Sequence, residues 1–262
     1  MHSLKILYLT LVQFGIHPLN TISFFRGLPI YIYQAVQFYL KSRILEQSLS
    51  VSSPYPCVVD RYQSAGSISN HYFHQDLWAA QKVYRNNPVH HIDIGSRIDG
   101  FVAHLLTFRS VEVLDIRSMK SQVLGMSFRQ VDLMQIESVP EAACDSVSCL
   151  HALEHFGLGR YGDPIDPVGH IKGLWALTKL IKPDGMLLLS VPIGKERVEF
   201  NAHRIFSVNT IIKLLTKEFE LISFSYIDDE NKFHECVEPS VVLDCMTYGC
   251  GLFEARKKSV NL

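Results

Sequence analysis

The stretch HHIDIGSRIDGFVAHLL, residues 90–106, decides the fold that we expect for this chain. Residues 91–94 have the apolar character of a short buried strand, and Gly95 ends it. The residues that follow carry apolar side chains at helical spacing. A strand, a glycine turn and a helix N-terminus present free backbone N–H groups to a ligand, so the stretch predicts a unit that cradles a nucleotide.

An acidic residue in the next apolar segment supports this prediction. Asp115 lies in VEVLDIR and follows Asp93 by 22 positions. An offset of about 20 residues is the one at which a carboxylate reaches the ribose hydroxyls of a bound nucleoside. The turn departs from the usual glycine-rich pattern, because Arg97 and Asp99 stand where glycines are common. A βαβ unit without a ligand therefore stays an alternative for this stretch alone.

Predicted strands and helices alternate through the rest of the chain. Strands are expected at residues 91–94, 111–116, 127–131, 146–150, 186–191, 220–226 and 251–255. Helices are expected at residues 99–108, 153–156 and beyond, 168–181 and 207–217. The alternation predicts an α/β, Rossmann-like fold. We expect seven strands in a mostly parallel sheet with an antiparallel last strand, and helices on both faces.

The sequence divides into three parts. Residues 1–50 form a helical N-terminal segment, residues 51–87 a linker and a lid helix, and residues 88–262 the main domain. The apolar runs LKILYLTLVQFGI and LPIYIYQAVQFYL are too short to span a membrane. They fit helices that pack on the domain, or an interfacial element that holds the protein peripheral to a membrane. Lys41 and Arg43, after the second run, favour the interfacial element.

Composition narrows the class of protein. The 262 residues carry a formal net charge of −1, so the chain lacks the basic surface that nucleic acid binding requires. The six cysteines form no CxxC pair, which is typical of reduced thiols in a cytoplasmic protein. The sequence indicates no particular oligomeric state.

Several segments resemble the class I S-adenosylmethionine-dependent methyltransferases. They are DIG, VDL after the third strand, CDSVSCLHALEH and LTKLIKPDGMLLLSVP, and the resemblance covers about residues 88–256. More narrowly, HYFHQDLW, LEHFGLGRYGDP and SVPIGKERVEFNAHRIFS resemble an uncharacterised methyltransferase-like family that is associated with surface-polysaccharide biosynthesis. The resemblance implies S-adenosyl-L-methionine as the cofactor. The resembled family has no assigned substrate, and we expect a polar acceptor, either a small molecule or a sugar or lipid-linked glycan.

The resemblance also assigns roles to individual residues. Asp93 would accept from the methionine ammonium group, and Asp115 would bind the ribose. Arg97 departs from the family's glycine pattern, so it would either obstruct the cofactor or contact its carboxylate. Asp132 would face adenine N6, with Leu133 against the ring. The complete set expected at the cofactor is Asp93, Gly95, Arg97, Gly100, Asp115, Ile116, Asp132 and Leu133.

Methyl transfer to a hydroxyl group needs a base, and histidine suits this role because its ordinary pKa lies near neutrality. The candidates are His151, His155 and His203, with Glu154 beside them; for His155 a helix-capping role is the alternative. The loop of residues 156–170 carries Arg160, Tyr161 and Asp163, which we expect to contact the acceptor. A plain surface loop is the alternative.

The segment HYFHQD spaces His71, His74 and Asp76 like metal ligands. No second cluster of ligands lies nearby, so we expect no metal site and instead hydrogen-bonded histidines in a lid helix. Residues 71–78 should line the same cavity as Asp93 and Asp115.

Two other functions remain open. The altered glycine pattern fits a non-catalytic binding or scaffold protein on the same fold. A nicotinamide-dependent Rossmann enzyme is a weaker alternative, because the third-glycine geometry is missing and the segment CMTYGCGLFEARKK suits an antiparallel last strand.

Overall fold

The computed structural model describes residues 8, 10–44, 53–61, 68, 70–241 and 246–259. The rest of the expected N-terminal helical segment, residues 1–7, 9 and 45–50, lies outside the described residues. The chain divides into two compact units, Met1–Ser67 and Ile68–Leu262. The helix expected to follow the linker therefore belongs to the second unit, together with the strands.

Helix α2 (Pro18–Ser42) is the main element of the first unit. Proline suits its first turn, where the N–H groups have no partner within the helix. Gly27 is buried, and a Cβ atom there would lie 2.6 Å from the carbonyl oxygen of Val58. Many apolar side chains of α2 are exposed, among them Phe25 and Phe38. Within the described residues, no helix has the length and apolar character needed to cross a membrane.

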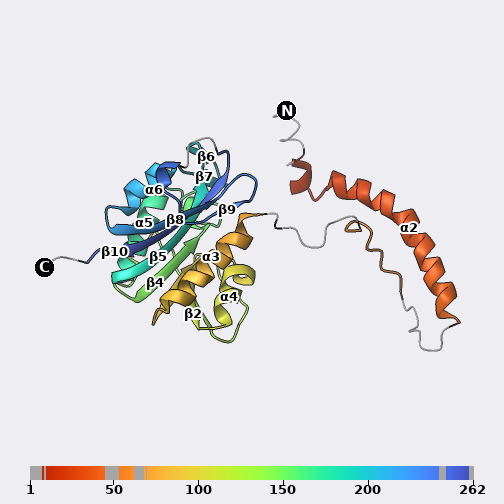
Figure 1. The fold of residues 1–262 in the computed structure, drawn as a ribbon, viewed down its shortest axis with the longest axis horizontal. Helices are drawn as coiled ribbons and strands as arrows, with labels where there is room; N and C mark the ends of the chain where they lie inside the picture. Colours follow the sequence, from red (N-terminus) through yellow and green to blue (C-terminus); the bar gives the residue numbers. More distant parts are fainter. Residues whose placement is uncertain are drawn as a thin grey trace. The chain divides into compact units, whose positions relative to one another are not determined.

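An eight-stranded sheet forms the centre of the second unit (Figure 1). Its strands are β1 (His91–Ile94), β2 (Val111–Asp115), β3 (Met126–Gln130), β4 (Cys144–Leu150), β5 (Ile181–Ile193), β8 (Phe219–Ile227), β9 (Phe233–His234) and β10 (Gly249–Lys257). Their spatial order is β3-β2-β1-β4-β5-β10-β8-β9. The first five strands of this order pair in parallel, and β10 runs antiparallel between β5 and β8. This agrees with the predicted mostly parallel sheet and its antiparallel last strand.

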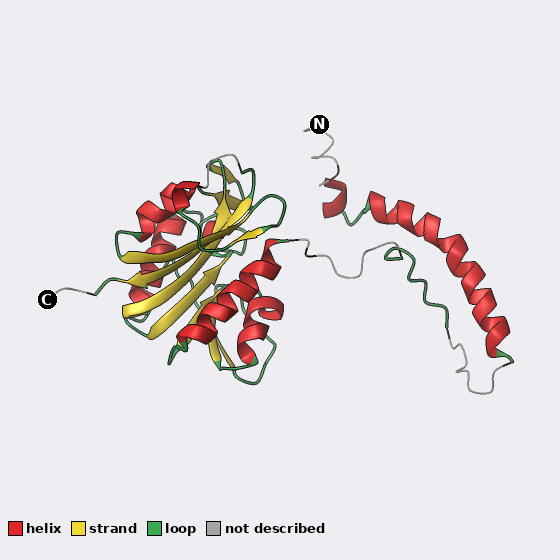
Figure 2. Cartoon of the chain, viewed as in Figure 1, coloured by secondary structure: helices red, strands yellow, loops and turns green. Residues whose placement is uncertain are grey.

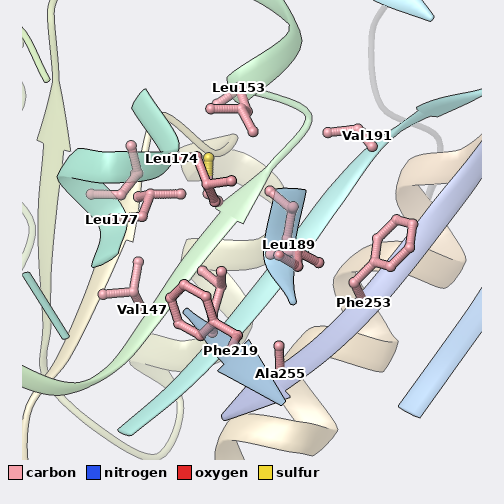
Figure 3. Close-up of a cluster of buried hydrophobic side chains, with 14 of the residues drawn as sticks. Val147, Leu153, Leu174, Leu177, Leu189, Val191, Phe219, Phe253 and Ala255 are labelled. Carbon is pink, nitrogen blue, oxygen red and sulfur yellow. The ribbon is translucent and has the colours of Figure 1, made fainter. Parts of the chain in front are cut away.

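Helices cover both faces of the sheet (Figure 2). One face carries α3 (His71–Asn86), the single π-turn η1 (Ile98–Val102) and α4 (Ala103–Leu106); the other carries α5 (Gly169–Leu180) and α6 (Val208–Leu215). Each face has its own apolar core. In Figure 3, Leu174 and Leu177 of α5 gather with Val147 of β4 and Leu189 of β5. Strands buried on both faces explain the nearly continuous apolar runs of β4 and β5.

The seven predicted strands are all present, and the structure adds short elements that the sequence did not reveal. Strand β9 is an eighth strand that pairs with the end of β8. Strands β6 (Arg197–Glu199) and β7 (His203–Ile205) form a separate hairpin after β5. Short 3₁₀ turns lie at η2 (Ile136–Ser138), η3 (Leu153–His155) and η4 (Pro239–Val241). With two or three residues each, β6, β7 and β9 carry no periodic signal.

The strand order reverses at β1, whose two neighbours are β2 and β4. In open α/β sheets, ligands bind at this switch point, outside the carboxyl ends of the strands. The segments after β1, β2, β3 and β4 therefore meet at one edge, which the antiparallel β10 reaches with its first residues.

Candidate functional site

The turn after β1 keeps a cleft open. Gly95 has φ +64°, a conformation that residues with a side chain rarely adopt. A Cβ atom added there would lie 3.2 Å from Cβ of Ala152 and 3.9 Å from Oδ2 of Asp115. A larger side chain would therefore fill the space between the ends of β2 and β4.

Asp115 ends β2 beside this cleft, and Arg117 holds its carboxylate. The backbone N–H of Arg117 donates to Oδ1 at 2.8 Å, and its guanidinium donates to Oδ1 at 3.0 Å and to Oδ2 at 2.6 Å. The guanidinium also lies 4.5 Å from the ring centroid of Tyr161. Half of the Arg117 side chain is exposed, so this ion pair is one that a ligand can displace at small cost.

Asp132 follows β3 and lines a small adjoining pocket of about 70 Å³. Its Oδ1 accepts from the N–H of Met134 at 2.9 Å. Ile116 and Leu133 contribute apolar walls to the same pocket. Asp115 and Asp163 line this pocket as well. Apolar walls with carboxylates beside them suit a flat heterocycle that carries an amino group.

The main cavity has a volume of about 720 Å³ and lies against these segments. Its walls include nine of the residues that the sequence singled out: Gly95, Arg97, Asp115, His151, Glu154, His155, Arg160, Tyr161 and His203. The prediction that residues 71–78 line this cavity is wrong, because Tyr72 alone of this part of α3 reaches it. Phe73 is exposed, and Gln75, Asp76 and Trp78 are buried within the domain.

Two imidazoles flank a buried carboxylate at the base of this cavity. Nδ1 of His151 lies 2.9 Å from Oε1 of Glu154, and Nε2 of His155 lies 3.6 Å from the same oxygen. Glu154 is 1% exposed. Burial opposes its ionisation, but His151 and His155 outweigh burial and hold the pKa of Glu154 below its ordinary value. The cluster therefore contains a carboxylate that can stabilise a proton on either imidazole.

The backbone at His151 is unusual. Its φ of +50° is rare for a residue with a side chain, and such conformations gather at functional sites. The N–H of His151 donates to the carbonyl and hydroxyl oxygens of Ser190, at 3.1 and 3.0 Å, which holds this conformation in place.

His155 has a defined tautomer. The carbonyl oxygen of Ala202 can only accept, so Nδ1 of His155 donates to it, at 2.6 Å, and Nε2 is left as the acceptor. Burial lowers the pKa of His155 below its ordinary value. His203, from β7, lies with its ring centroid 6.4 Å from that of His155, and its Nε2 is 3.2 Å from Oε2 of Glu199.

Three residues that the sequence analysis assigned to ligand binding instead make contacts within the protein. Asp93 is fully buried, and its carboxylate accepts from the N–H and Oγ of Ser96 and from Oγ of Ser148. Gly100 packs against the carboxylate of Asp76 in α3, where a Cβ atom would clash. The third is Asp163, whose carboxylate accepts hydrogen bonds from the backbone of its own loop.

Asp163 organises the loop after η3. Its carboxylate accepts from the backbone N–H groups of Gly157, Gly159 and Tyr161, at 2.8, 3.1 and 3.2 Å. Arg160 donates to the carbonyl oxygen of Ala202 at 3.0 Å and remains exposed at the cavity rim. Arg97 is also exposed, with an ion pair to Asp99 at 3.3 Å.

Sequence reasoning missed Arg117 and Tyr248 at the cavity. Arg117 follows the acidic strand end by two residues, so its position was visible, but its contact with Asp115 was not. Tyr248 precedes β10 and packs on His203 with ring centroids 5.0 Å apart. Because β10 is antiparallel to β5, its first residues lie at the edge where the parallel strands end. The prediction from the sequence considered only residues that follow parallel strands, and so it did not include Tyr248.

Comparison with known proteins places the chain in a family. A family model described as "Caenorhabditis protein of unknown function, DUF268" matches residues 95–240, more than half of the chain. The protein belongs to the DUF268 family. The matched region runs from the glycine turn after β1 to beyond β9, and contains η3, α5 and α6. No curated protein matches the sequence.

Solved structures show the fold that this DUF268 protein has. The N-methyltransferase NodS from Bradyrhizobium japonicum WM9, in complex with S-adenosyl-l-homocysteine, is 12% identical, with a TM-score of 0.50 over 73% of this chain and 90% of that one. The YcgJ protein from Bacillus subtilis is 12% identical, with a TM-score of 0.50 over 71% and 99%. The [4+2]-cyclase SpnF is 13% identical, with a TM-score of 0.51 over 70% and 81%. The fold is the Rossmann-like fold of class I methyltransferases, and it hosts more than one chemistry.

Proposed function

We propose that this protein is an S-adenosylmethionine-dependent methyltransferase with a polar acceptor, a sugar hydroxyl of a surface polysaccharide or of its lipid-linked precursor. One observation carries the proposal: Asp115 ends β2, Asp132 follows the adjacent β3, and the two line neighbouring pockets that share Gly95 and Asp115. Bound S-adenosylmethionine would supply an electrophilic methyl group for in-line displacement.

The residues present fit this cofactor. Gly95 leaves the space that a Cβ atom would fill, Asp115 is placed for the ribose hydroxyls, and Asp132 borders the apolar pocket for adenine. Arg97 lies at the cavity wall, where a guanidinium suits a carboxylate. Arg117 has to release Asp115 when the ribose binds.

His155 is the proposed base. Its Nδ1 is held by the carbonyl oxygen of Ala202, so Nε2 is free to take a proton from an acceptor hydroxyl. Burial lowers the pKa of His155, which keeps the imidazole neutral at neutral pH. Once Nε2 is protonated, the Glu154 carboxylate at 3.6 Å stabilises the imidazolium. His203 and His151 line the same cavity and are the other candidates.

The cavity rim suits a sugar. Tyr161 and Tyr248 line its opening beside Arg160 and His203, although the Arg117 guanidinium lies over the Tyr161 ring and His203 packs on Tyr248. Aromatic rings pack on the apolar face of a pyranose, while charged and polar side chains hydrogen-bond its hydroxyl groups. This combination supports a polar acceptor that presents a sugar hydroxyl to the cavity.

The proposal extends to location. The described cysteines are unpaired thiols: Cys57, Cys144, Cys149, Cys236 and Cys250. Free thiols fit the reducing cytoplasm. Exposed apolar side chains of α2, followed by Lys41 and Arg43, support peripheral contact with a membrane that carries the lipid-linked acceptor. Flotation of the full chain with anionic vesicles, compared with a chain that starts at Ile68, tests this contact; equal flotation would exclude it.

The experiment for the activity follows transfer of a labelled methyl group from S-adenosylmethionine. The full chain is incubated with a panel of free sugars, nucleotide sugars and lipid-linked glycans, and label in the acceptor is measured. Transfer to a sugar supports the proposal. Binding of S-adenosylhomocysteine without transfer to any acceptor would favour the non-catalytic scaffold, and oxidation of a nicotinamide cofactor would favour the dehydrogenase.

A further inference from the structure

Three side chains with metal-binding atoms converge beside the cavity. His71 begins α3, His151 follows β4, and Cys250 lies near the start of β10. One nitrogen of each imidazole and Sγ of Cys250 all lie within 4.8 Å of one another. Among the described residues, no other group of three or more such ligands lies this close together.

His151 is oriented in the way that metal-binding histidines are. Its Nδ1 lies 2.9 Å from Oε1 of Glu154, and its side chain is 5% exposed. Its Nε2 is buried and has no hydrogen-bond partner in the described part of the chain. A histidine that binds a metal typically donates its other N–H to a carboxylate, which fixes the ring. The free Nε2 is therefore aimed at a site with no bonding atom of the protein to satisfy it.

Cys250 also lacks a strong partner. It is fully buried, and its hydrogen bonds are long, to Oε1 of Gln75 at 3.9 Å and to the carbonyl oxygen of Gly251 at 4.0 Å, with the rings of His71 and His151 beside it. Oε1 of Gln75 already accepts from Oγ of Ser190 at 2.6 Å. The thiol is thus available to a ligand that prefers sulfur.

The donor set indicates zinc. One thiolate and two imidazoles are ligands that zinc prefers, and three protein ligands leave one position open, as in catalytic zinc sites. Tetrahedral zinc spaces its ligand atoms by roughly 3.3–3.8 Å, so small side-chain rotations would close the observed separations. A hollow of about 180 Å³ lies against His71, His151, Tyr72 and Tyr248.

We propose that His71, His151 and Cys250 bind a zinc ion whose open position faces this hollow. The ion would hold a water molecule or an acceptor oxygen there. This site adjoins the main cavity, because His151 lines both, but it shares no residue with the glycine turn or with Asp115 and Asp132.

The proposed ligands differ from the set suggested by sequence spacing. Of His71, His74 and Asp76, only His71 belongs to the convergent group. The ring of His74 stacks on Phe233, with centroids 5.8 Å apart. Oδ1 of Asp76 accepts from Nε2 of its neighbour Gln75 at 3.0 Å. His74 is therefore a matched control on the same helix.

Cobalt is the probe for this site. The full chain, stripped of metal with a chelator, is titrated with Co²⁺ and followed by absorption spectroscopy. We expect one cobalt per chain, with a sulfur-to-cobalt charge-transfer band that zinc abolishes. Cys250→Ser should remove the band, and Glu154→Gln should weaken metal binding about 10- to 100-fold, as loss of a histidine's supporting carboxylate does elsewhere.

The controls are His74→Ala and Cys236→Ser, which removes an exposed thiol. Both should bind cobalt as the wild type does, while His71→Ala should bind at least about 10-fold more weakly. If Cys250→Ser does not fold, as judged by circular dichroism, the wild-type spectrum and the His71→Ala titration decide. A wild-type spectrum without the charge-transfer band would overturn the proposal. So would binding that depends on Cys236 or His74 instead.

Discussion

Replacing Asp115 with alanine should weaken the binding of S-adenosylhomocysteine about 10- to 150-fold. The carboxylate ends β2 at the cavity wall, and its side chain is 12% exposed. Hydrogen bonds to a charged group contribute about 1.5–3 kcal/mol when one partner is removed. Because 1.4 kcal/mol is a factor of about ten in Kd, this loss gives the stated range.

Replacing Arg117 should have the opposite effect on ligand binding to replacing Asp115. In the structure Arg117 occupies the Asp115 carboxylate that the ribose needs, so ligand binding has to displace it. Half of its side chain is exposed, and such ion pairs contribute less than about 1 kcal/mol. Arg117→Ala should therefore bind S-adenosylhomocysteine as tightly as the wild type, or up to about fivefold more tightly.

Isothermal titration calorimetry on the full chain measures both effects. Glu112→Ala is the matched control, because Glu112 is an acid of the same strand whose carboxylate pairs with His90 and Arg129. The reasoning fails if Asp115→Ala binds as Glu112→Ala does. It also fails if Arg117→Ala binds tenfold more weakly, since Arg117 would then contact the ligand, as an arginine contacts the 2′-phosphate of NADP.

Three further changes test other parts of the site. Gly95→Val should abolish S-adenosylhomocysteine binding and lower the free energy of unfolding by at least about 1–2 kcal/mol, because its φ is +64°; retained binding in calorimetry would contradict an open cleft. Burial raises the pKa of Asp93 to about 6, although hydrogen bonds from Ser148 and Ser96 act to lower it. The folded state then holds this proton more tightly than the unfolded chain, so the contribution of Asp93 to stability is largest below about pH 4 and falls by about 3 kcal/mol as the pH rises past 6. In urea titrations, Asp93→Asn should lack this fall; an unchanged pH profile would refute it. His155→Ala should lower turnover about 10²–10⁴-fold with cofactor affinity retained, and equal turnover would exclude His155 as the base.

The centre of the sheet was predictable because β1, β4 and β5 are largely buried and therefore apolar. Apolar runs bounded by Gly95 and by the turn at Pro183–Gly185 mark β1 and β5 in the sequence. Strand β5 begins earlier than predicted, at Ile181, because that residue pairs with Cys144 before the register shifts. The hairpin of β6 and β7 was not predictable, since three residues give no period.

The sequence predicted only those parts of the site that follow from the order of strands along the chain. Residues after parallel strands meet at one edge, which brought Asp115, His151 and His155 to one cavity. The sequence could not show that the carboxylate of Asp93 accepts hydrogen bonds from Ser96 and Ser148. The first contact depends on the shape of the turn after β1, and the second depends on the register between β1 and β4.

A crystal structure of the full chain with S-adenosylhomocysteine tests the central claim most directly. We expect the ribose hydroxyls on the carboxylate of Asp115, adenine in the pocket of Asp132 and Leu133, and the Arg117 guanidinium displaced. A ligand bound elsewhere, or the Arg117 guanidinium still paired with Asp115 while the ligand is bound, would contradict it.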